Sequence, residues 1–169
     1  MLKTTIWLTG LPCSGKTTIA KRLKQEIENK GYNVVHLDGD DVREKLNKDL
    51  NFSPEHRKEN LRRIAHVAKL LNENKNLVIA SFVSPANDLR KLIQDIIGNV
   101  KLVHIKCGLE ECERRDVKGM YEKARKGEIP NFTGIDAPFE EPENAHLVVN
   151  TEGNDLETCV EQIIKHFKF

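Results

Sequence analysis

A glycine-rich run near the start of the chain has the residue types and spacing of a phosphate-binding loop. Gly10-Leu11-Pro12-Cys13-Ser14-Gly15-Lys16-Thr17 fits G-x-x-x-x-G-K-[ST], follows an apolar stretch and opens a helical one. Glycines let successive backbone N–H groups turn toward an anion at the start of a helix, where negative charge is favoured. In such a loop the lysine reaches the β- and γ-phosphates and the next hydroxyl ligates Mg²⁺. The run, continued by Thr18, therefore predicts a site for ATP with Mg²⁺, with Lys16 catalytic and Thr17 a metal ligand.

Two carboxylates at positions i and i+2 follow the second apolar stretch of the chain. Asp38 and Asp40 flank Gly39, and Asp41 comes next. Phosphoryl transfer to a hydroxyl needs a group that accepts the proton and metal help for the developing charge. Either Asp38 or Asp40 could accept the proton while the other holds Mg²⁺, and Asp38 or Asp41 could instead cap a short helix. We expect one of the three to cap and at least one to be catalytic.

Cationic and aromatic side chains further along the chain predict the acceptor site. Arg43 and Arg57 are placed to converge on an anionic acceptor, and Asn60 shares a helix face with Arg57 at i, i+3. Phe52 precedes a helix cap, so it could pack against the core as a staple or stack on an aromatic base. Both interpretations of Phe52 stay open on this evidence.

Apolar runs that alternate with helical periodicity predict the elements that carry these groups. The candidate strands are residues 5–9, 33–37, 77–81, 101–106 and 146–150. Their apolarity is continuous, which indicates strands buried on both faces of a parallel sheet. The candidate helices run from Lys16 toward Gly31, from a Ser53 cap with Pro54 at its first position, and over residues 88–97, 109–115 and 156–167. The alternation predicts a three-layer α/β fold of the P-loop NTPase type, with a five-stranded parallel sheet and helices on both faces.

One polar stretch interrupts the alternation. Residues 117–141 are rich in lysine and glutamate and contain several glycines and prolines but no strand signal. A connection this long in a compact domain is usually functional or disordered, and we interpret it as a mobile lid with a short helix near 121–126. No linker or repeat divides the chain, so a single domain over residues 1–169 is expected.

Composition excludes several classes of function. The 27 Lys and Arg against 26 Asp and Glu leave a net charge of +1, which argues against nucleic-acid binding through many phosphates. No apolar stretch approaches the roughly 20 residues that span a bilayer, and the start has no secretory signal pattern, so we expect a cytoplasmic protein without a membrane partner. The 4 cysteines form no CxxC pair and predict thiols rather than a zinc site.

The type of P-loop protein follows from what accompanies the loop. A GTPase needs a late Asn-Lys-x-Asp motif, and the early Asn47-Lys48-Asp49 lacks both its spacer and its position. The third strand ends in Ala80-Ser81 without the acidic residue typical of larger ATPases. Small size and a lid favour a kinase for a small molecule. A kinase for a nucleoside, gluconate or a shikimate-like acid, or a regulatory module that binds ATP without transfer, remain alternatives.

Beyond the P-loop, the sequence resembles the adenylyl-sulfate kinase (APS kinase) family in segments that follow one another over nearly the whole chain. The matching segments are Asp38-Gly39-Asp40-Asp41-Val42-Arg43, Asn51-Phe52-Ser53, Arg57-x-x-Asn60, Ser81-Phe82-Val83-Ser84-Pro85, Asp116-Val117-Lys118-Gly119 and Phe132-Thr133-Gly134-Ile135-Asp136. The resemblance implies transfer of the ATP γ-phosphoryl group to the 3′-hydroxyl of adenylyl sulfate. It also implies a homodimer and a separate ATP sulfurylase upstream.

The same resemblance implies roles for individual residues. Phe52 and Phe132 would sandwich the acceptor adenine, which favours stacking for Phe52. Contacts to the rest of the acceptor would come from Asp40, Arg43, Arg57, Asn60, Ser84, Pro85, Lys118 and Thr133. Arg115 would lie near the ATP base, and Arg125 would add charge on lid closure. Ser84 is the family's labelled active-site serine, but a serine nucleophile needs an adjacent base, so we expect it to contact substrate without being phosphorylated. Val117 stands where the family has proline, which implies a less rigid hinge.

Overall fold

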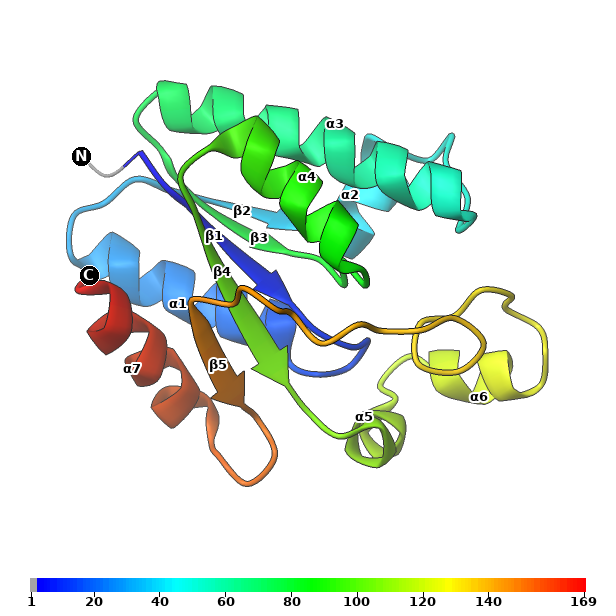
Figure 1. The fold of residues 1–169 in the computed structure, drawn as a ribbon. Helices are drawn as coiled ribbons and strands as arrows, with labels where there is room; N and C mark the ends of the chain where they lie inside the picture. The colour runs from blue at the N-terminus through cyan, green and yellow to red at the C-terminus, as the bar shows by residue number, and fades with distance from the viewer. Residues whose placement is uncertain (1–2) are drawn as a thin grey trace.

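A five-stranded parallel sheet forms the centre of the molecule, seen in a computed structural model that describes residues 3–169 (Figure 1). The strand order is β2-β3-β1-β4-β5, and every neighbouring pair is parallel. The strands are β1 (Thr5–Thr9), β2 (Val34–Asp38), β3 (Leu77–Ser81), β4 (Val100–Lys106) and β5 (Leu147–Asn150). The predicted α/β fold is confirmed, with strand ends that differ from the predicted ones by at most one residue.

Helices cover both faces of the sheet. One face carries α1 (Lys16–Asn29) and α7 (Leu156–Phe167), and the opposite face carries α3 (Pro54–Glu73) and α4 (Asn87–Ile97) (Figure 1). Strand β1 shows why its apolarity is continuous: Ile6 and Leu8 pack into the core with α1, whereas Trp7 packs into the core with α3 and α4. All three side chains are fully buried, so each face of the strand contributes to a separate core.

Three short helices complete the fold near the carboxyl ends of the strands. They are α2 (Gly39–Lys45), α5 (Leu109–Arg115) and α6 (Met120–Arg125). Asp38 ends β2 and caps α2, because its side chain accepts a hydrogen bond from the backbone N–H of Asp40. The expectation that one of the three aspartates caps a helix is thus met by Asp38.

The lid, residues 117–141, is ordered around a small apolar cluster. Tyr121 and Phe132 pack with Cys107 and Cys112, and their rings meet edge to face at 4.9 Å between centroids. The predicted lid helix is α6, and a single bridge joins Thr133 to Ala137. These apolar side chains anchor a segment that is polar for most of its length, and its mobility stays a prediction.

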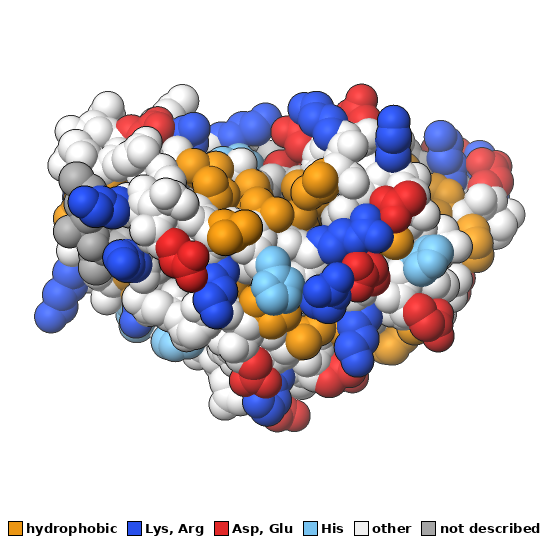
Figure 2. Space-filling view, turned by 90° about the horizontal axis from the view of Figure 1, so that it is seen from above, with side chains coloured by type: hydrophobic (Ala, Val, Ile, Leu, Met, Phe, Trp, Pro, Cys, Tyr) orange, Lys and Arg blue, Asp and Glu red, His pale blue; other side chains and the backbone are white. Residues whose placement is uncertain are grey.

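The surface over α3 and α4 mixes charges of both signs. Figure 2 shows this face, where basic and acidic side chains alternate around a few apolar ones. Arg62 and Arg63 both pair with Glu59, and Arg63 also pairs with Asp49, so this part of α3 carries an ion-paired face. Within residues 3–169, no helix is both long enough and apolar enough to cross a bilayer.

Candidate active site

The phosphate loop joins β1 to α1 with a backbone conformation that needs glycine. Gly15, the residue before α1, has φ of 101°, and a Cβ on Gly10 would lie 2.4 Å from the carbonyl oxygen of Ile105. A side chain at either position would distort the loop. Lys16 turns back over it: its Nζ donates to the carbonyl oxygens of Gly10 at 2.9 Å and Leu11 at 2.6 Å. These carbonyls hold the ammonium where it faces the loop.

Burial makes the charge of Lys16 costly in the absence of an anion. Desolvation lowers the pKa of its ammonium to about 8, with Cys112, Cys13 and Asp40 opposing the shift. The residue is only 8% exposed. Phosphates bound beside the ammonium would add negative charge and so return its pKa toward the usual value.

We therefore expect the affinity for Mg-ATP to fall as the pH rises above about 8. Below that pH the free protein already carries the ammonium, whereas above it each binding event must take up a proton. The dissociation constant would rise by up to about tenfold per pH unit. Calorimetric titration with a non-hydrolysable ATP analogue between about pH 7 and pH 9.5 measures this. Lys16→Arg is the control, because a guanidinium stays charged throughout this range. A dissociation constant for the wild type that does not change with pH would contradict the assignment.

Thr17 and Asp38 form a hydroxyl–carboxylate pair beside the loop. Thr17 Oγ1 donates to Asp38 Oδ2 at 2.7 Å, and Ser81 Oγ donates to the same oxygen at 2.9 Å. Burial alone would raise the pKa of Asp38, but hydrogen bonds from Thr17, Ser81 and the Asp40 backbone outweigh it and lower the pKa. The carboxylate is therefore ionised at neutral pH. Mg²⁺ commonly takes one or two protein oxygens with phosphates and water, so the pair fits the predicted metal site.

That fit does not depend on a dense cluster of metal ligands. Residues 3–169 contain no group of three or more histidine, cysteine or acidic side chains arranged to hold a metal ion. An ion here would need phosphate oxygens to complete its coordination, which suits a metal that arrives with its nucleotide.

Asp40 differs from Asp38 in its surroundings. Its side chain is 77% exposed and pairs with Lys118 of the lid at 2.5 Å. The contact raises the pKa of Lys118. Asp40 thus points into the open site while Asp38 is bound to the loop, which separates two carboxylates that the sequence left interchangeable.

Arg43 and Arg57 both lie against the ring of Phe52, and their predicted convergence on an anionic acceptor stays a prediction. The guanidinium carbon of Arg43 lies 4.3 Å from the Phe52 ring centroid, and that of Arg57 lies 5.9 Å from it. Burial lowers the pKa of both guanidinium groups, and the charge of Arg57 adds to the effect on Arg43. Phe52 is 45% exposed, so it is not a buried staple. Two cations and an exposed ring suit an anion with an aromatic group.

The lid contacts both sides of the site. Arg57 Nη1 donates to Thr133 Oγ1 at 2.7 Å, and Nη2 donates to the carbonyl oxygen of Asn131. Tyr121 Oη donates to the carbonyl oxygen of Pro12 in the phosphate loop at 2.9 Å. The lid therefore joins the phosphate loop to Arg57.

Ser84 lies in the loop after β3 with an unusual backbone. Its φ is 45°, and its hydroxyl oxygen accepts a hydrogen bond from Trp7 Nε1 at 2.9 Å. The residue is 2% exposed, and none of its hydrogen bonds joins the hydroxyl to a histidine or carboxylate. A hydroxyl without a base is a poor nucleophile, which agrees with a contact role.

At the other end of the site Arg115 is held by a residue that the sequence analysis missed. Arg115 Nη2 donates to the carbonyl oxygen of Thr151 at 2.9 Å, and Thr151 Oγ1 donates to that of Ser14 at 2.9 Å. Thr151 directly follows β5, at the edge where ligands of parallel sheets bind. The rule that identified Asp38 would have identified Thr151 as well.

Comparison with known proteins identifies the family. The adenylylsulphate kinase family model matches residues 2–150. The chain belongs to this family. It is 51% identical to an adenylyl-sulfate kinase of Bacillus licheniformis and 50% identical to a probable one of Bacillus subtilis, each over 96% of this chain and 84% of the relative. An APS kinase from Mycobacterium tuberculosis, solved in complex with AMPPNP and APS, superposes with a TM-score of 0.95 at 38% identity, covering 98% of both chains.

A cavity of about 910 Å³ brings together most of the residues that the resemblance to adenylylsulphate kinases singled out. It is lined by Pro12, Cys13, Gly15, Lys16, Thr17, Thr18, Asp38, Asp40, Arg43, Phe52, Arg57, Asn60, Ser84, Pro85, Arg115, Lys118, Phe132 and Thr133. Gly10, Leu11 and Ser14 shape the loop without lining this cavity. Arg125 does not line it either and pairs instead with Glu113 at 2.5 Å, so its predicted approach to the site is not seen.

Proposed function

We propose that this chain transfers the γ-phosphoryl group of ATP to the 3′-hydroxyl of adenylyl sulfate, giving 3′-phosphoadenylyl sulfate and ADP for sulfate assimilation. The observation that carries the proposal is the single cavity that Lys16, Asp38, Arg43 and Phe52 line together. A phosphate loop, two carboxylates and an aromatic anion site in one space suit two nucleotides bound for direct transfer. Family membership supports adenylyl sulfate over gluconate or a shikimate-like acid, which offer no ring for Phe52.

The transfer needs only residues that surround this cavity. The acceptor 3′-oxygen attacks the γ-phosphorus as the bond to the β,γ-bridging oxygen breaks, and the hydroxyl proton passes to Asp40. Lys16 stabilises charge on the phosphates, and Thr17 with Asp38 would hold Mg²⁺. Bound Mg²⁺ would supply further neutralisation of the β- and γ-phosphate oxygens. Asp40 suits the proton acceptor because it is exposed to the cavity, whereas Asp38 is occupied by Thr17 and Ser81.

Recognition of the acceptor is divided among three kinds of group. Phe52 and Phe132 would stack on its adenine. Arg43, Arg57 and Asn60 would bind the phosphosulfate and ribose, with further contacts from Ser84, Pro85, Lys118 and Thr133. Arg115 would lie beside the ATP base.

The setting of the reaction follows the same proposal. The chain would work as one catalytic domain with a lid that closes, as a homodimer in the cytoplasm, and would depend on a separate ATP sulfurylase for its acceptor. It would need no nucleic acid or membrane.

The deciding experiment offers the purified protein Mg-ATP with adenylyl sulfate and, in parallel, Mg-ATP with gluconate. Anion-exchange chromatography should detect 3′-phosphoadenylyl sulfate and an equal amount of ADP in the first mixture only. ATP hydrolysis with the adenylyl sulfate unchanged would overturn the proposal and favour a module that binds ATP without transfer.

Direct transfer also predicts that Ser84 carries no phosphate during turnover. Its hydroxyl accepts from Trp7 and lies in a loop held by backbone contacts, so no base prepares it for attack. Rapid-quench experiments with γ-³²P ATP should give no labelled protein before product forms, and Ser84→Ala should retain measurable transfer. A phosphoserine that forms and decays at the rate of turnover would contradict this prediction.

A further inference from the structure

Arg90, on α4, is a buried arginine that none of the roles above uses. The residue is 2% exposed. Its Nη1 donates to the carbonyl oxygen of Ser84 at 3.0 Å, and its Nη2 donates to that of Glu140 at 2.6 Å and to Asn87 Oδ1 at 3.0 Å. Its Nε is buried without a partner. Burial of a charged guanidinium group costs desolvation free energy, so we looked for a functional role in its hydrogen bonds.

The first of these contacts leads to the active site. Ser84 has a positive φ of 45°, a strained conformation for a non-glycine residue that persists only where its surroundings enforce it. Its carbonyl oxygen accepts from Arg90 and from Thr9 Oγ1, and its hydroxyl accepts from Trp7. Arg90 therefore helps to fix the loop that brings Ser84 and Pro85 to the cavity.

The second contact leads to the downstream end of the lid, residues 138–141. Glu140 is held on three sides: its N–H donates to the Pro85 carbonyl at 2.8 Å, its carboxylate accepts from the Asn87 N–H at 2.7 Å, and its carbonyl accepts from Arg90. The Phe139 ring lies 5.5 Å from the Arg90 guanidinium carbon. Arg90 thus donates hydrogen bonds both to the lid end and to the loop that carries Ser84 and Pro85.

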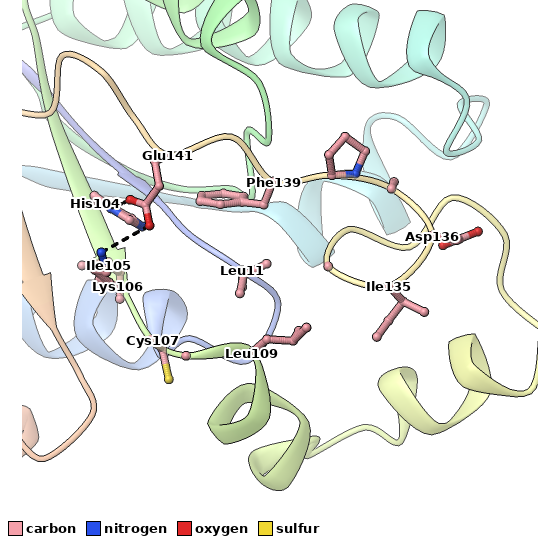
Figure 3. A pocket seen from close by; sticks show the side chains of 14 residues that line it. Leu11, His104, Ile105, Lys106, Cys107, Leu109, Ile135, Asp136, Phe139 and Glu141 are labelled. Carbon is pink, nitrogen blue, oxygen red and sulfur yellow. Dashed lines mark ion pairs between the residues drawn. The ribbon is translucent and has the colours of Figure 1, made fainter.

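Apart from its contacts with Arg90, Asn87 and Pro85, the lid end meets β4 across a cavity. A cavity of about 680 Å³ lies against it, lined on the other side by Leu11, Ile105 and Leu109 (Figure 3). Across this cavity the Glu141 carboxylate pairs with His104 of β4 at 3.4 Å and with Lys106 at 3.3 Å, as Figure 3 shows. The Phe139 ring also lies against His104, with 5.7 Å between the ring centroids. Polar contacts, together with the Phe139 ring, therefore set the position of this segment.

We propose that Arg90 is a positioning residue for the acceptor, acting by coupling the lid end to the loop of Ser84 and Pro85. The lid contacts the acceptor side through Arg57 and Thr133. When the lid closes on an acceptor, its downstream end must stay fixed, and Arg90 holds that end. The hydrogen bonds of Arg90 go to Ser84, Asn87 and Glu140 and not to the phosphate loop or α1, so we expect ATP binding not to depend on it. The inference rests on the proposed function, because its kinetic readout is the Michaelis constant for adenylyl sulfate.

The test compares Arg90→Met and Arg90→Lys with Ile93→Ala. Ile93 is 1% exposed on the same helix and packs in the core beneath it, so its truncation destabilises α4 without touching the lid end. Arg90→Met should raise the Michaelis constant for adenylyl sulfate by about tenfold or more and leave the dissociation constant for Mg-ATP unchanged. Arg90→Lys should recover part of the loss, because one ammonium can still donate to either carbonyl. Ile93→Ala should lower the melting temperature and leave both constants unchanged.

A second readout does not depend on catalysis. Hydrogen exchange at the backbone N–H of Glu140 should accelerate in Arg90→Met and remain slow in Ile93→Ala. If the wild type transfers no phosphoryl group, the proposed function fails, while the exchange data still report whether Arg90 anchors the lid end. If the wild type is active and the Arg90 variants keep its Michaelis constant, the inference is overturned. It is overturned as well if Ile93→Ala raises that constant equally. Should Arg90→Met not fold, Arg90→Lys alone decides by the same two readouts.

Discussion

Replacement of Lys16 by methionine is expected to abolish phosphoryl transfer without destabilising the folded protein. The ammonium is the buried cation of the phosphate loop, held by the carbonyl oxygens of Gly10 and Leu11. In transfer it meets charge that develops on the β- and γ-phosphates, and loss of one such preorganised group typically costs about 10²–10³-fold in rate. ATP binding should weaken as well, because a lysine at this position would contact the phosphates before and during transfer.

The stability of this variant separates a functional role from a structural one. Burial lowers the pKa of Lys16 from 10.5 to about 8, so keeping the ammonium charged in the folded state costs up to about 3 kcal/mol near neutral pH. The loop carbonyls offset part of this, and methionine fills a similar volume without a charge. The free energy of unfolding of Lys16→Met should therefore equal or exceed that of the wild type in urea denaturation.

The matched control is Lys24→Met on the same helix. Lys24 is partly exposed and pairs with Glu28 at 3.6 Å, so its loss should change neither activity nor stability by much. A Lys16→Met protein that lost activity together with several kcal/mol of stability would indicate that the lysine mainly holds the loop together.

The sheet and the phosphate loop could be predicted from the sequence because both depend on local pattern. Continuous apolar runs such as residues 77–81 bury both faces of a strand, and the loop between β1 and α1 carries its glycines at fixed spacing. The sequence also singled out Arg43, Arg57 and Phe52, and the structure brings both guanidinium groups to the Phe52 ring beside the strand ends.

Arg90 could not be predicted, because its burial depends on a segment 50 residues further along the chain. Taken alone, an arginine on an amphipathic helix belongs to the solvent side; the lid end returns over it only in the folded protein. Arg125 shows the converse. Its placement on the lid predicts an approach to the substrate, but α6 directs it to Glu113 on α5. Both cases turn on contacts between elements, which no local pattern encodes.

Asp40→Asn is expected to lower the turnover number by about 10²–10⁴-fold while leaving the dissociation constant for Mg-ATP unchanged. The amide keeps the size of the side chain and removes its ability to take the proton of the attacking hydroxyl. Because the Asp40 side chain is 77% exposed and pairs only with Lys118 on the lid, its replacement leaves no buried group without a partner. Folding should therefore be unaffected, and single-turnover kinetics with saturating Mg-ATP would isolate the transfer step.

Two neighbours in the sequence supply the controls that assign the roles. Asp41→Asn removes the same charge from the same helix turn, where Asp41 pairs with the exposed Lys45, and should be nearly silent. Asp38→Asn should instead weaken Mg-ATP binding, because Asp38 Oδ2 accepts from both Thr17 and Ser81 at the predicted metal site. If Asp38→Asn slowed transfer with normal Mg-ATP affinity and Asp40→Asn weakened that affinity, the two roles would be exchanged. The hydrogen bonds that lower the pKa of Asp38 argue against that outcome, because they stabilise its ionised form and so oppose its taking a proton.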